Sequence, residues 1–401
     1  MVTQFYAPVV GGEERMVQTL STELVERGHR VAVVTLRHPD VSARATVDGV
    51  EIYRIQSTLA RVGRLFVDTS RPHAPPAPDP EALVALARVL DLEQPDVVHA
   101  HNWLFHSLLP LRAIKKFPLV VSLHDYSLVC ATKRLMRNGV SRCAGPGPAK
   151  CVACAIHRYG PLKGPVIATL AYPMGRIAET LVDLFLPVSE TVARLTGIDR
   201  HGAAYEVISN FVPDDPDVSL EAPPGLASVG DGYILFVGDA TADKGIDVLL
   251  DAYQELEGPP PLVLIGRALS PRLRRLPKGV LHIDPVPHPS VLGAMRRAAV
   301  VVVPSIWDEP FGLSAIEAMS MGRPVVTTTA GALPELVVHR ETGIVVPPAD
   351  VGLLRDALAE LLGSERLQRQ FGDGGLRRSQ IFRASSVIPR FERAYARVSE
   401  R

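Results

Sequence analysis

Short apolar runs rich in β-branched residues alternate with segments of helical periodicity along both halves of this chain. Because strands connected through helices pair in parallel, the alternation predicts an α/β protein with doubly wound sheets. A stretch rich in proline and glycine, from Pro213 to Gly230, is typical of a linker. We therefore expect two facing domains, 1–210 and 211–385, with a C-terminal helix of about 386–401 that packs back on the first. The predicted strands are Val2–Tyr6, Arg30–Leu36, Asp96–Ala100, Leu119–Leu123, Leu184–Val188 and Tyr205–Ile208, then Tyr233–Val237, Leu262–Ile265, Val280–Ile283, Val300–Val303 and Val325–Thr328.

Composition excludes several classes of protein. An apolar fraction of 47% can fill large cores, and 43 basic against 43 acidic residues give no net attraction to nucleic acid. The sequence has no apolar run of about 18 residues that would span a membrane, and its start lacks the pattern of a signal peptide. We expect a cytoplasmic protein. Val2–Tyr6 resembles the end of a strand whose beginning is missing.

The sequence predicts the position of one glutamate closely. Val300–Val303 reads as a strand buried on both faces. Pro310 disfavours helical geometry at the residue before it, so Glu309 is expected in the turn that follows this strand. Its carboxylate would then face the crevice outside the carboxyl edge of the sheet, where doubly wound folds bind their ligands.

A helix is expected to begin directly after this turn. The amides of Phe311, Gly312 and Leu313 would have no intrahelical partner and would favour negative charge. Glu317, eight residues after Glu309, adds a second carboxylate. The combination suits a sugar joined to a diphosphate and a ribose. A plain strand–turn–helix with two solvated glutamates is the alternative that the residues leave open.

Polar, charged or glycine residues also follow the other predicted strands. Imidazoles gather in the first half of the chain, whereas carboxylates and cations gather in the second. Since the carboxyl ends of parallel strands meet at one edge, each set is expected to cluster. In chain order the residues are Gly11, Gly12, His99, His101, His124, Asp239, Lys244 and Arg267.

Together these residues resemble a known family. The spacing of Glu309 and Glu317 reproduces the E-x7-E motif of the large retaining, nucleotide-sugar-dependent glycosyltransferase family, group 1, whose fold is GT-B. The resemblance covers nearly the whole chain and implies two facing Rossmann-like domains with the active site in the interdomain cleft. The other matching segments are Gly11-Gly12, Pro95–His101, His124-Asp125, Ile208–Asn210, Lys244-Gly245, Val303–Ser305, Gly322–Val326 and Thr342-Gly343.

The resemblance implies roles for residues of the second domain. Glu309 would accept hydrogen bonds from the hydroxyls of the donor sugar, and Glu317 would hold the ribose. Lys244 would neutralise the leaving diphosphate, which fixed charges stabilise best in a site without water. Retention in this family is attributed to front-face attack, so Glu309 is not expected to be a nucleophile.

Further donor contacts are implied on both domains. The amides near Phe311, Gly312 and Leu313 would meet the sugar and the diphosphate. In the first, acceptor-side domain, His124 would contact the donor sugar, and the backbone of the Gly11-Gly12 pair would approach the phosphates.

The chain departs from the family pattern at two positions. Asp239 stands where the family often has an arginine aimed at the diphosphate, and we expect Arg267 to supply the missing cation. Asp284 stands near the expected place of the nucleobase, where a glycine is common. The single D-x-D sequence, Asp215–Asp217, lies in the linker and reads as a solvated turn. No catalytic metal is expected.

Four cysteines lie close together in a basic segment. Between Arg112 and Lys163 there are ten basic residues and one acidic residue, Asp125. Four thiolates in a cytoplasmic chain suit a structural zinc site. Free or redox-active thiols, a disulfide and an iron–sulfur site are the alternatives. The cysteines are Cys130, Cys143, Cys151 and Cys154.

The expected protein is therefore an enzyme that moves a hexose-type sugar from a nucleoside diphosphate to an acceptor hydroxyl, in the biosynthesis of a glycan, a glycolipid or a glycosylated metabolite. A nucleotide-sugar epimerase of the same fold and a non-catalytic subunit that binds a sugar nucleotide are the alternatives. Its partners are expected to be the nucleotide sugar and a carbohydrate, lipid-linked or small-molecule acceptor. The basic segment also suits weak peripheral contact with the inner face of a membrane.

Overall fold

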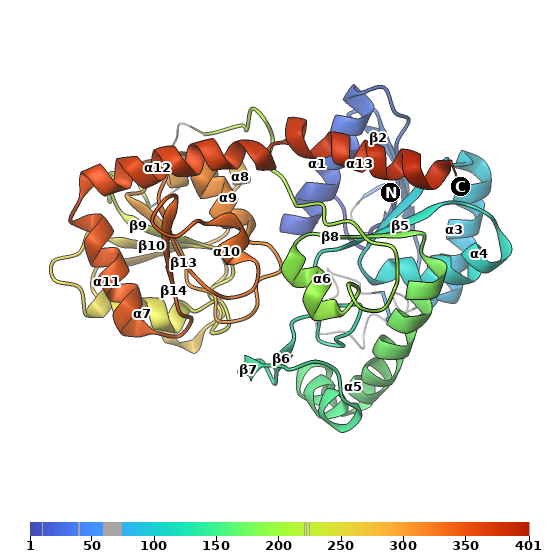
Figure 1. The fold of residues 1–401 in the computed structure, drawn as a ribbon, viewed down its shortest axis with the longest axis horizontal. Helices are drawn as coiled ribbons and strands as arrows, with labels where there is room; N and C mark the ends of the chain where they lie inside the picture. The colour runs from blue at the N-terminus through green and yellow to red at the C-terminus, as the bar shows by residue number, and fades with distance from the viewer. Residues whose placement is uncertain are drawn as a thin grey trace. The chain divides into compact units, whose positions relative to one another are not determined.

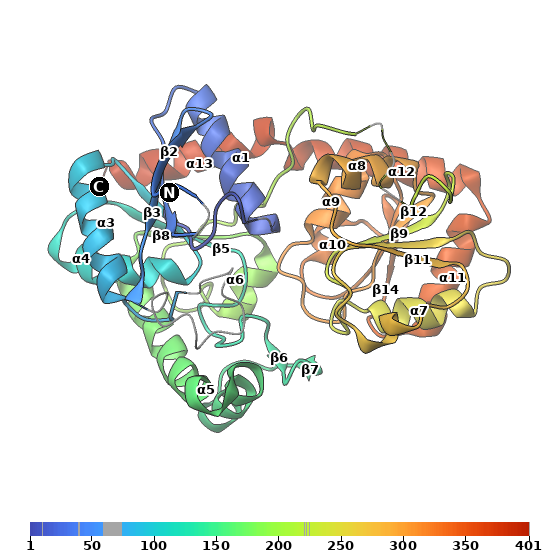
Figure 2. The same ribbon diagram turned by 180° about the vertical axis from the view of Figure 1, so that it is seen from behind.

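The computed structural model describes residues 1–9, 11–38, 41–58, 74–219, 221, 223 and 225–400. The chain forms two compact units, each with helices around mainly parallel strands (Figure 1, with the reverse view in Figure 2). Unit 1 comprises Met1–Asn138, Cys143–Ser209 and Val387–Arg401, and unit 2 comprises Gly139–Arg142 and Asn210–Ser386. Among the described residues, no helix has the length and apolar character needed to cross a membrane.

The N-terminal segment joins two groups of strands in unit 1. Val2 bridges Val34 on one side and Ala100 on the other, both in parallel. The order across the sheet is therefore β3-β1-Val2-β4-β5-β8. The chain order reverses at Val2, so the switch point lies between this segment and β4. The strands are β1 (Ala32–Leu36), β3 (Val50–Ile55), β4 (Val98–His101), β5 (Leu119–Leu123) and β8 (Leu184–Pro187).

The sequence patterns missed some strands of unit 1 and overstated one. β2 (Arg44–Val47) runs antiparallel to β3 at the edge of the sheet and was not predicted, because three of its four residues are exposed. The segment predicted as a strand at Tyr205–Ile208 forms a single β-bridge, from Tyr205 to Phe185, and its Glu206 and Ile208 N–H groups donate to carbonyls of β8. Two short strands were also not predicted: Met136–Arg137 (β6) of unit 1 and Ser141–Arg142 (β7), which belongs to unit 2.

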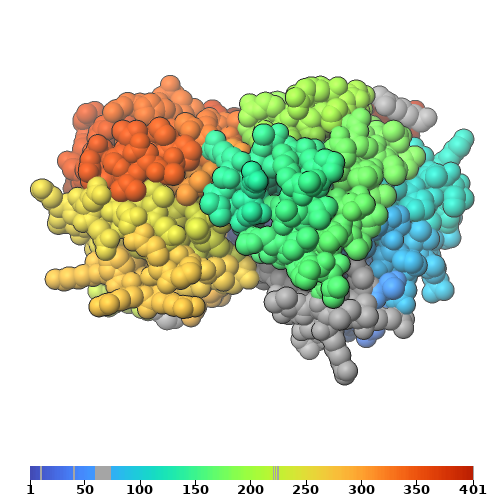
Figure 3. All heavy atoms as spheres, turned by 90° about the horizontal axis from the view of Figure 1, so that it is seen from below, coloured from blue at the N-terminus to red at the C-terminus, as the bar shows by residue number. Residues whose placement is uncertain are grey.

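The helices of unit 1 include one that is unusually long. α5 runs from Pro148 to Leu181, and non-helical backbone at Gly160 divides it into two parts. It lies at the surface (Figure 3), where Leu162 is 88% exposed. The other helices are α1 (Gly12–Glu26), α3 (Pro80–Glu93), η2 (Trp103–Leu108), α4 (Leu109–Ile114) and α6 (Glu190–Thr196). α13 (Ala384–Ser399) ends the chain, and its Tyr395 hydroxyl bonds to His99 of β4 at 2.8 Å.

Unit 2 holds one parallel six-stranded sheet in the order β11-β10-β9-β12-β13-β14. The chain order reverses between β9 and β12, which are direct neighbours. Loops that leave the carboxyl ends of these two strands therefore flank the switch point, where sheets of this type bind ligands. The strands are β9 (Ile234–Val237), β10 (Leu262–Ile265), β11 (Val280–Ile283), β12 (Val300–Val303), β13 (Val325–Thr328) and β14 (Gly343–Val346).

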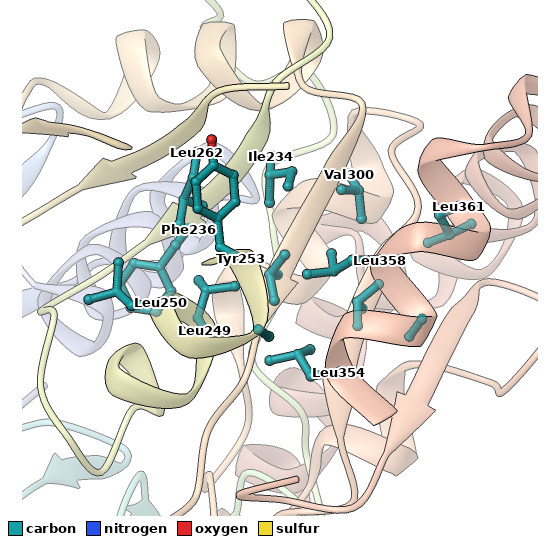
Figure 4. Packing of buried hydrophobic residues seen from close by; sticks show 14 of the residues in the cluster. Ile234, Phe236, Leu249, Leu250, Tyr253, Leu262, Val300, Leu354, Leu358 and Leu361 are labelled. Carbon is teal, nitrogen blue, oxygen red and sulfur yellow. The ribbon is translucent and has the colours of Figure 1, made fainter. Parts of the chain in front are cut away.

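A dense apolar core holds this sheet rigid. Side chains of β9 and β12 pack with those of α7 (Ile246–Gln254) and α11 (Val351–Leu362), as Figure 4 shows for Phe236, Leu249 and Leu358. Burial of such side chains contributes about 1.5–3 kcal/mol each. The remaining helices are η3 (Pro271–Arg274), α8 (His288–Arg297), α9 (Leu313–Ser320), α10 (Leu333–Leu336), α12 (Glu365–Ser379) and η4 (Gln380–Phe382).

Candidate functional site

An ion pair bridges the switch point of unit 2. Lys244 comes from the loop after β9, and Glu309 comes from the loop after β12. The Lys244 Nζ atom lies 2.8 Å and 3.0 Å from the two carboxylate oxygens of Glu309. Glu309 is only 7% exposed. A cation and a carboxylate thus neutralise each other at the place where a ligand would enter.

Two further donors hold the Glu309 carboxylate. The Trp307 Nε1–H and the Ser305 hydroxyl both donate to its Oε2 atom, at 2.8 Å and 2.9 Å. Both residues belong to the same short loop, and sequence reasoning did not assign them a role. Their position in the sequence could have predicted this role, because both carry hydrogen-bond donors and they precede Glu309 by two and four residues. The second oxygen, Oε1, accepts from Lys244.

Close backbone packing fixes the position of Glu309. A Cβ atom on Gly331 would lie 2.2 Å from the Glu309 nitrogen, so this site accepts only glycine. The Ala332 N–H donates to the Glu309 carbonyl at 2.8 Å. Likewise, a Cβ atom on Gly245 would lie 1.9 Å from the carbonyl oxygen of Pro304, which brings the Lys244 loop against the β12 loop. The Lys244–Glu309 ion pair therefore depends on backbone contacts at Gly331 and Gly245 that a larger side chain would prevent.

The start of α9 lies next to this loop. Gly312 has φ 109°, a conformation that favours glycine, and Leu313 is the first helical residue. Phe311 is 4% exposed and packs edge-on against Phe382. The first amides of a helix have no intrahelical acceptor and attract negative charge. Phe311, Gly312 and Leu313 thus occupy the helix start that the sequence predicted for them.

The second carboxylate of the motif has its own partner. Glu317 lies within α9 and is 6% exposed. Its Oε1 atom lies 2.8 Å from Nε2 of His288, the first residue of α8. Sequence reasoning missed His288, which follows Pro287 in the loop after β11. This histidine helps to orient the Glu317 carboxylate.

Arg267 and Asp239 form an ion pair of their own. The Arg267 Nε–H donates to Asp239 at 2.8 Å, and its terminal nitrogen contacts the other carboxylate oxygen. The two residues follow β10 and β9, which are neighbouring strands. Arg267 therefore offsets the negative charge of Asp239, the residue that departs from the family pattern. Both side chains are substantially exposed, so the pair contributes little to stability.

In unit 1, three histidines form a row across β4 and the loop after β5. The Nδ1 atom of His101 lies 2.9 Å from Nε2 of His124, and the two rings stack. His99 bonds to the Ser122 hydroxyl at 2.8 Å. Burial holds the pKa values of His99 and His101 well below the usual range. Both rings are therefore neutral, and the hydrogen bond with His101 orients the His124 ring.

The predicted glycine pair lies at the start of α1. Gly11 is the N-cap residue in extended backbone, and Gly12 is the first residue of the helix. The helix follows the Val2 segment, so the pair lies at the carboxyl edge of the unit 1 sheet. Gly11 has no side chain that could cap the N-terminal amides of α1.

The structure does not support the zinc prediction. In the part of the chain that the structure describes, no three His, Cys, Asp or Glu side chains gather so that they could hold a metal ion. All four cysteines are free. Their sulfurs have separate neighbours: Cys151 accepts from Gly147 N–H, Cys143 bonds to the Gly145 carbonyl and Cys154 bonds to the Met136 carbonyl. Cys130 contacts the Thr132 hydroxyl. The close sequence spacing did not bring the thiols to a common point.

Comparison with known families gives two matches. Residues 10–215 match Glycosyltransferase Family 4, and residues 231–364 match Glycosyl transferases group 1. The first match alone spans more than half of the chain.

Individual proteins are similar over nearly the whole length. The chain is 29% identical to the glycogen synthase of Mycobacterium tuberculosis over 387 residues, which cover 90% of this chain and 85% of that protein. Sucrose-phosphate synthase from Thermosynechococcus elongatus has the same fold, with a TM-score of 0.73 at 20% identity and 99% coverage of both chains. HepE of Anabaena in complex with UDP-glucose follows with a TM-score of 0.68 at 15% identity and 98% coverage of both. The likeness to these solved structures shows that this chain has a GT-B fold.

Proposed function

Because this chain belongs to the family 4, group 1 glycosyltransferases, we propose that it moves a hexose-type sugar from a nucleoside diphosphate to an acceptor hydroxyl, with retention of the anomeric configuration. The observation that carries this proposal is the Lys244–Glu309 pair at the switch point of unit 2. When the donor binds, Lys244 can leave Glu309 and contact the diphosphate. Glu309 can then accept hydrogen bonds from hydroxyls of the sugar.

The chemistry of the pair supports transfer. As the leaving group departs, negative charge grows on the diphosphate, and a fixed ammonium group stabilises that charge. Glu309 keeps the donors Trp307 and Ser305 on its Oε2 atom, so Oε1 is the oxygen released when Lys244 turns to the phosphate. That oxygen can then accept from the sugar and orient its reacting carbon. We propose no covalent intermediate on Glu309.

The nucleotide part of the donor is proposed to lie along α9. Glu317 would accept from the ribose hydroxyls, with His288 holding its carboxylate in place. The amides of Phe311, Gly312 and Leu313 would meet the diphosphate and the sugar. HepE is a GT-B protein whose structure contains UDP-glucose, which supports a nucleotide sugar as the donor class. Because lysine and amides already provide positive charge, the proposed reaction needs no metal ion.

Unit 1 is proposed to bind the acceptor, with His124 and the Gly11-Gly12 pair contacting the donor. From Tyr126 to Ala178 the chain has no acidic residue, whereas it carries basic residues throughout. Such a surface would attract an acidic or phosphorylated acceptor, and it would hold the protein weakly at an anionic membrane face. We propose a cytoplasmic location for this activity.

Arg267 has a more limited proposed role. Its pairing with Asp239 removes the repulsion that an isolated carboxylate would exert on a diphosphate. An unpaired Asp239 would favour a non-catalytic subunit, because it would repel the diphosphate, so the pair favours the enzyme.

Kinetics of two matched variants test the proposal. The nucleotide sugar is first identified among UDP-, GDP- and ADP-linked hexoses as the one that raises the melting temperature, since a ligand that binds only the native state stabilises it. Glu309→Gln should lower kcat by about 100-fold or more, because its contacts form at the reacting centre. Glu317→Gln should mainly raise the donor KM. Near-normal kinetics in both variants would refute the proposed function.

A further inference from the structure

One helix of unit 1 carries large apolar side chains on its solvent side. The second part of α5 begins after the non-helical backbone at Gly160. Leu162, Val166 and Ile177 are 88%, 58% and 45% exposed, and Tyr172 beside them is 41% exposed. Their spacing is close to whole helical turns, so Leu162, Val166 and Ile177 lie on one face. We call this the outer face of α5, and its exposed members are Leu162, Val166, Thr169, Pro173 and Ile177.

The opposite face of the same helix consists of small residues. Gly164, Ala171, Gly175 and Ala178 are all buried. A Cβ atom on Gly175 would lie 1.9 Å from the carbonyl oxygen of Leu128, so the helix backbone lies directly against the domain. Surface helices of soluble domains normally bury their large apolar side chains and expose polar ones. α5 has the reverse arrangement, because its small residues contact the domain and its large apolar residues face outward.

The outer face can leave water at little cost. The Thr169 hydroxyl, in the middle of this face, donates to the Pro165 carbonyl at 2.7 Å. Residues 164–175 include no charged side chain. Single exposed apolar residues are ordinary, whereas several aligned on one face mark a surface that contacts an apolar partner or a membrane. Burial of this face would therefore leave neither a charge nor the Thr169 hydroxyl unpaired.

The charges of α5 indicate which of these partners fits. The helix carries four basic residues against one acidic residue, Glu179, which pairs with Arg176. A second copy of this chain would bring these cations against their own equivalents in a symmetric contact. An anionic lipid surface instead offers an apolar phase beside negative charge, which basic residues near the ends of an apolar stretch can reach. The basic residues are Lys150, Arg158, Lys163 and Arg176.

The length of the apolar stretch determines how it can meet a membrane. At about 1.5 Å per residue, residues 164–175 extend about 18 Å, whereas the hydrocarbon core of a bilayer is about 30 Å thick. Such a helix lies in the plane of the membrane surface and does not cross it. α5 lies at the outside of unit 1 in both ribbon views, Figure 1 and Figure 2.

We propose that the outer face of α5 is the surface by which this protein binds an anionic lipid membrane. Leu162, Val166 and Ile177 enter the boundary between headgroups and acyl chains, and Arg158 and Lys163 contact lipid phosphates. The inference rests on the membrane contact proposed above for unit 1, and it assigns that contact to one face of one helix.

The test is sedimentation with vesicles in the absence of any nucleotide sugar. The wild type should bind vesicles of phosphatidylglycerol and phosphatidylcholine about fivefold or more tightly than vesicles of phosphatidylcholine alone, and added salt should reduce this preference. Leu162→Gln with Val166→Gln should lower the affinity about tenfold or more, because two apolar side chains no longer enter the bilayer. Arg158→Gln with Lys163→Gln should remove most of the preference for phosphatidylglycerol.

Val84→Gln with Leu92→Gln is the matched control. It makes the same pair of changes on α3 of unit 1, where the two side chains are 48% and 60% exposed. It should leave vesicle binding unchanged. The proposal is overturned if the α5 pair binds within about twofold of the wild type, or if the α3 pair loses as much affinity. A wild-type dimer in sedimentation velocity that the α5 pair dissociates would also overturn it, because a second copy would then cover the face.

Val166→Trp decides if the α5 pair fails to fold. A blue shift of its emission on addition of anionic vesicles, with quenching by spin-labelled acyl chains, supports insertion; emission that vesicles do not change refutes it. Leu92→Trp should show neither effect. Because no donor is present in these measurements, their failure would leave the proposed transfer intact. A wild type that binds vesicles through α5 but releases diphosphate from none of the nucleotide sugars would refute the proposed function alone.

Discussion

Replacement of Trp307 by phenylalanine should impair transfer, although no tryptophan was expected in the site. The Trp307 indole donates to the Oε2 atom of Glu309 at 2.8 Å, and the tryptophan is 8% exposed. A hydrogen bond to a charged group is worth about 1.5–3 kcal/mol. If the bond persists in the transition state, its loss corresponds to about a 10- to 150-fold decrease in kcat. Phenylalanine keeps an aromatic face near Lys244, whose Nζ atom lies 5.3 Å from the ring centre.

The assay is steady-state release of the nucleoside diphosphate, with stability measured in parallel by urea unfolding. Tyr233→Phe serves as the control, because it also removes a buried aromatic donor in unit 2, one that bonds to the Ala294 carbonyl at 2.6 Å. Tyr233 lies at the opposite end of β9 from the site, so this variant should lose stability and keep kcat. A Trp307→Phe enzyme with kcat within about twofold of the wild type would show that the indole does not position Glu309 during the reaction.

Three other predictions concern charge and pH. Lys244→Ala should weaken binding of free nucleoside diphosphate as well as turnover, because the charge it stabilises is already present in the product; unchanged affinity in calorimetry would contradict its assignment. Activity should survive treatment with EDTA, and full loss that magnesium or manganese restores would overturn the metal-independent reaction. Stability in urea should fall as pH drops below about 6.5, by up to about 1.4 kcal/mol per pH unit for each buried histidine. Burial lowers the pKa values of His99, His101 and His106, the last to about 3, so these rings take up protons only on unfolding. Glu13 has the opposite effect and offsets the contribution of one of these three histidines. Its pKa is raised to about 7 in the folded state, so it favours the folded state as pH falls through 7. A stability that does not change between pH 7.5 and pH 5.5 would contradict the sign of this effect.

Strand patterns in the sequence were reliable where both faces of a strand are buried. Val300–Val303 and Val325–Thr328 have the bounds that their β-branched runs predicted. The exposed edge strand β2 and the strand β14, with its initial glycine, escaped prediction because their patterns are weak. Tyr205–Ile208 bonds to β8 through the N–H groups of Glu206 and Ile208 but forms only one β-bridge, at Tyr205.

The cysteines illustrate the limit of reasoning from spacing. A C-x-x-C sequence at Cys151 suggested converging thiols, but this segment lies at the start of α5, where its sulfurs bond to separate neighbours. Spacing along the chain sets which side chains are near in sequence. It does not set whether residues such as Cys130, on another loop, come to the same point.

The sequence by itself determined the α/β class, the two halves and the strand ends from which Lys244 and Glu309 project, because burial periodicity and backbone-restricting residues act locally. Only the tertiary structure decided which atoms meet there. Gly331 and Gly245 allow backbones to touch across loops that are distant in sequence. The choice of partners for Glu309 follows from those approaches, since a hydrogen bond or an ion pair depends on separations of a few tenths of an ångström that no local pattern encodes.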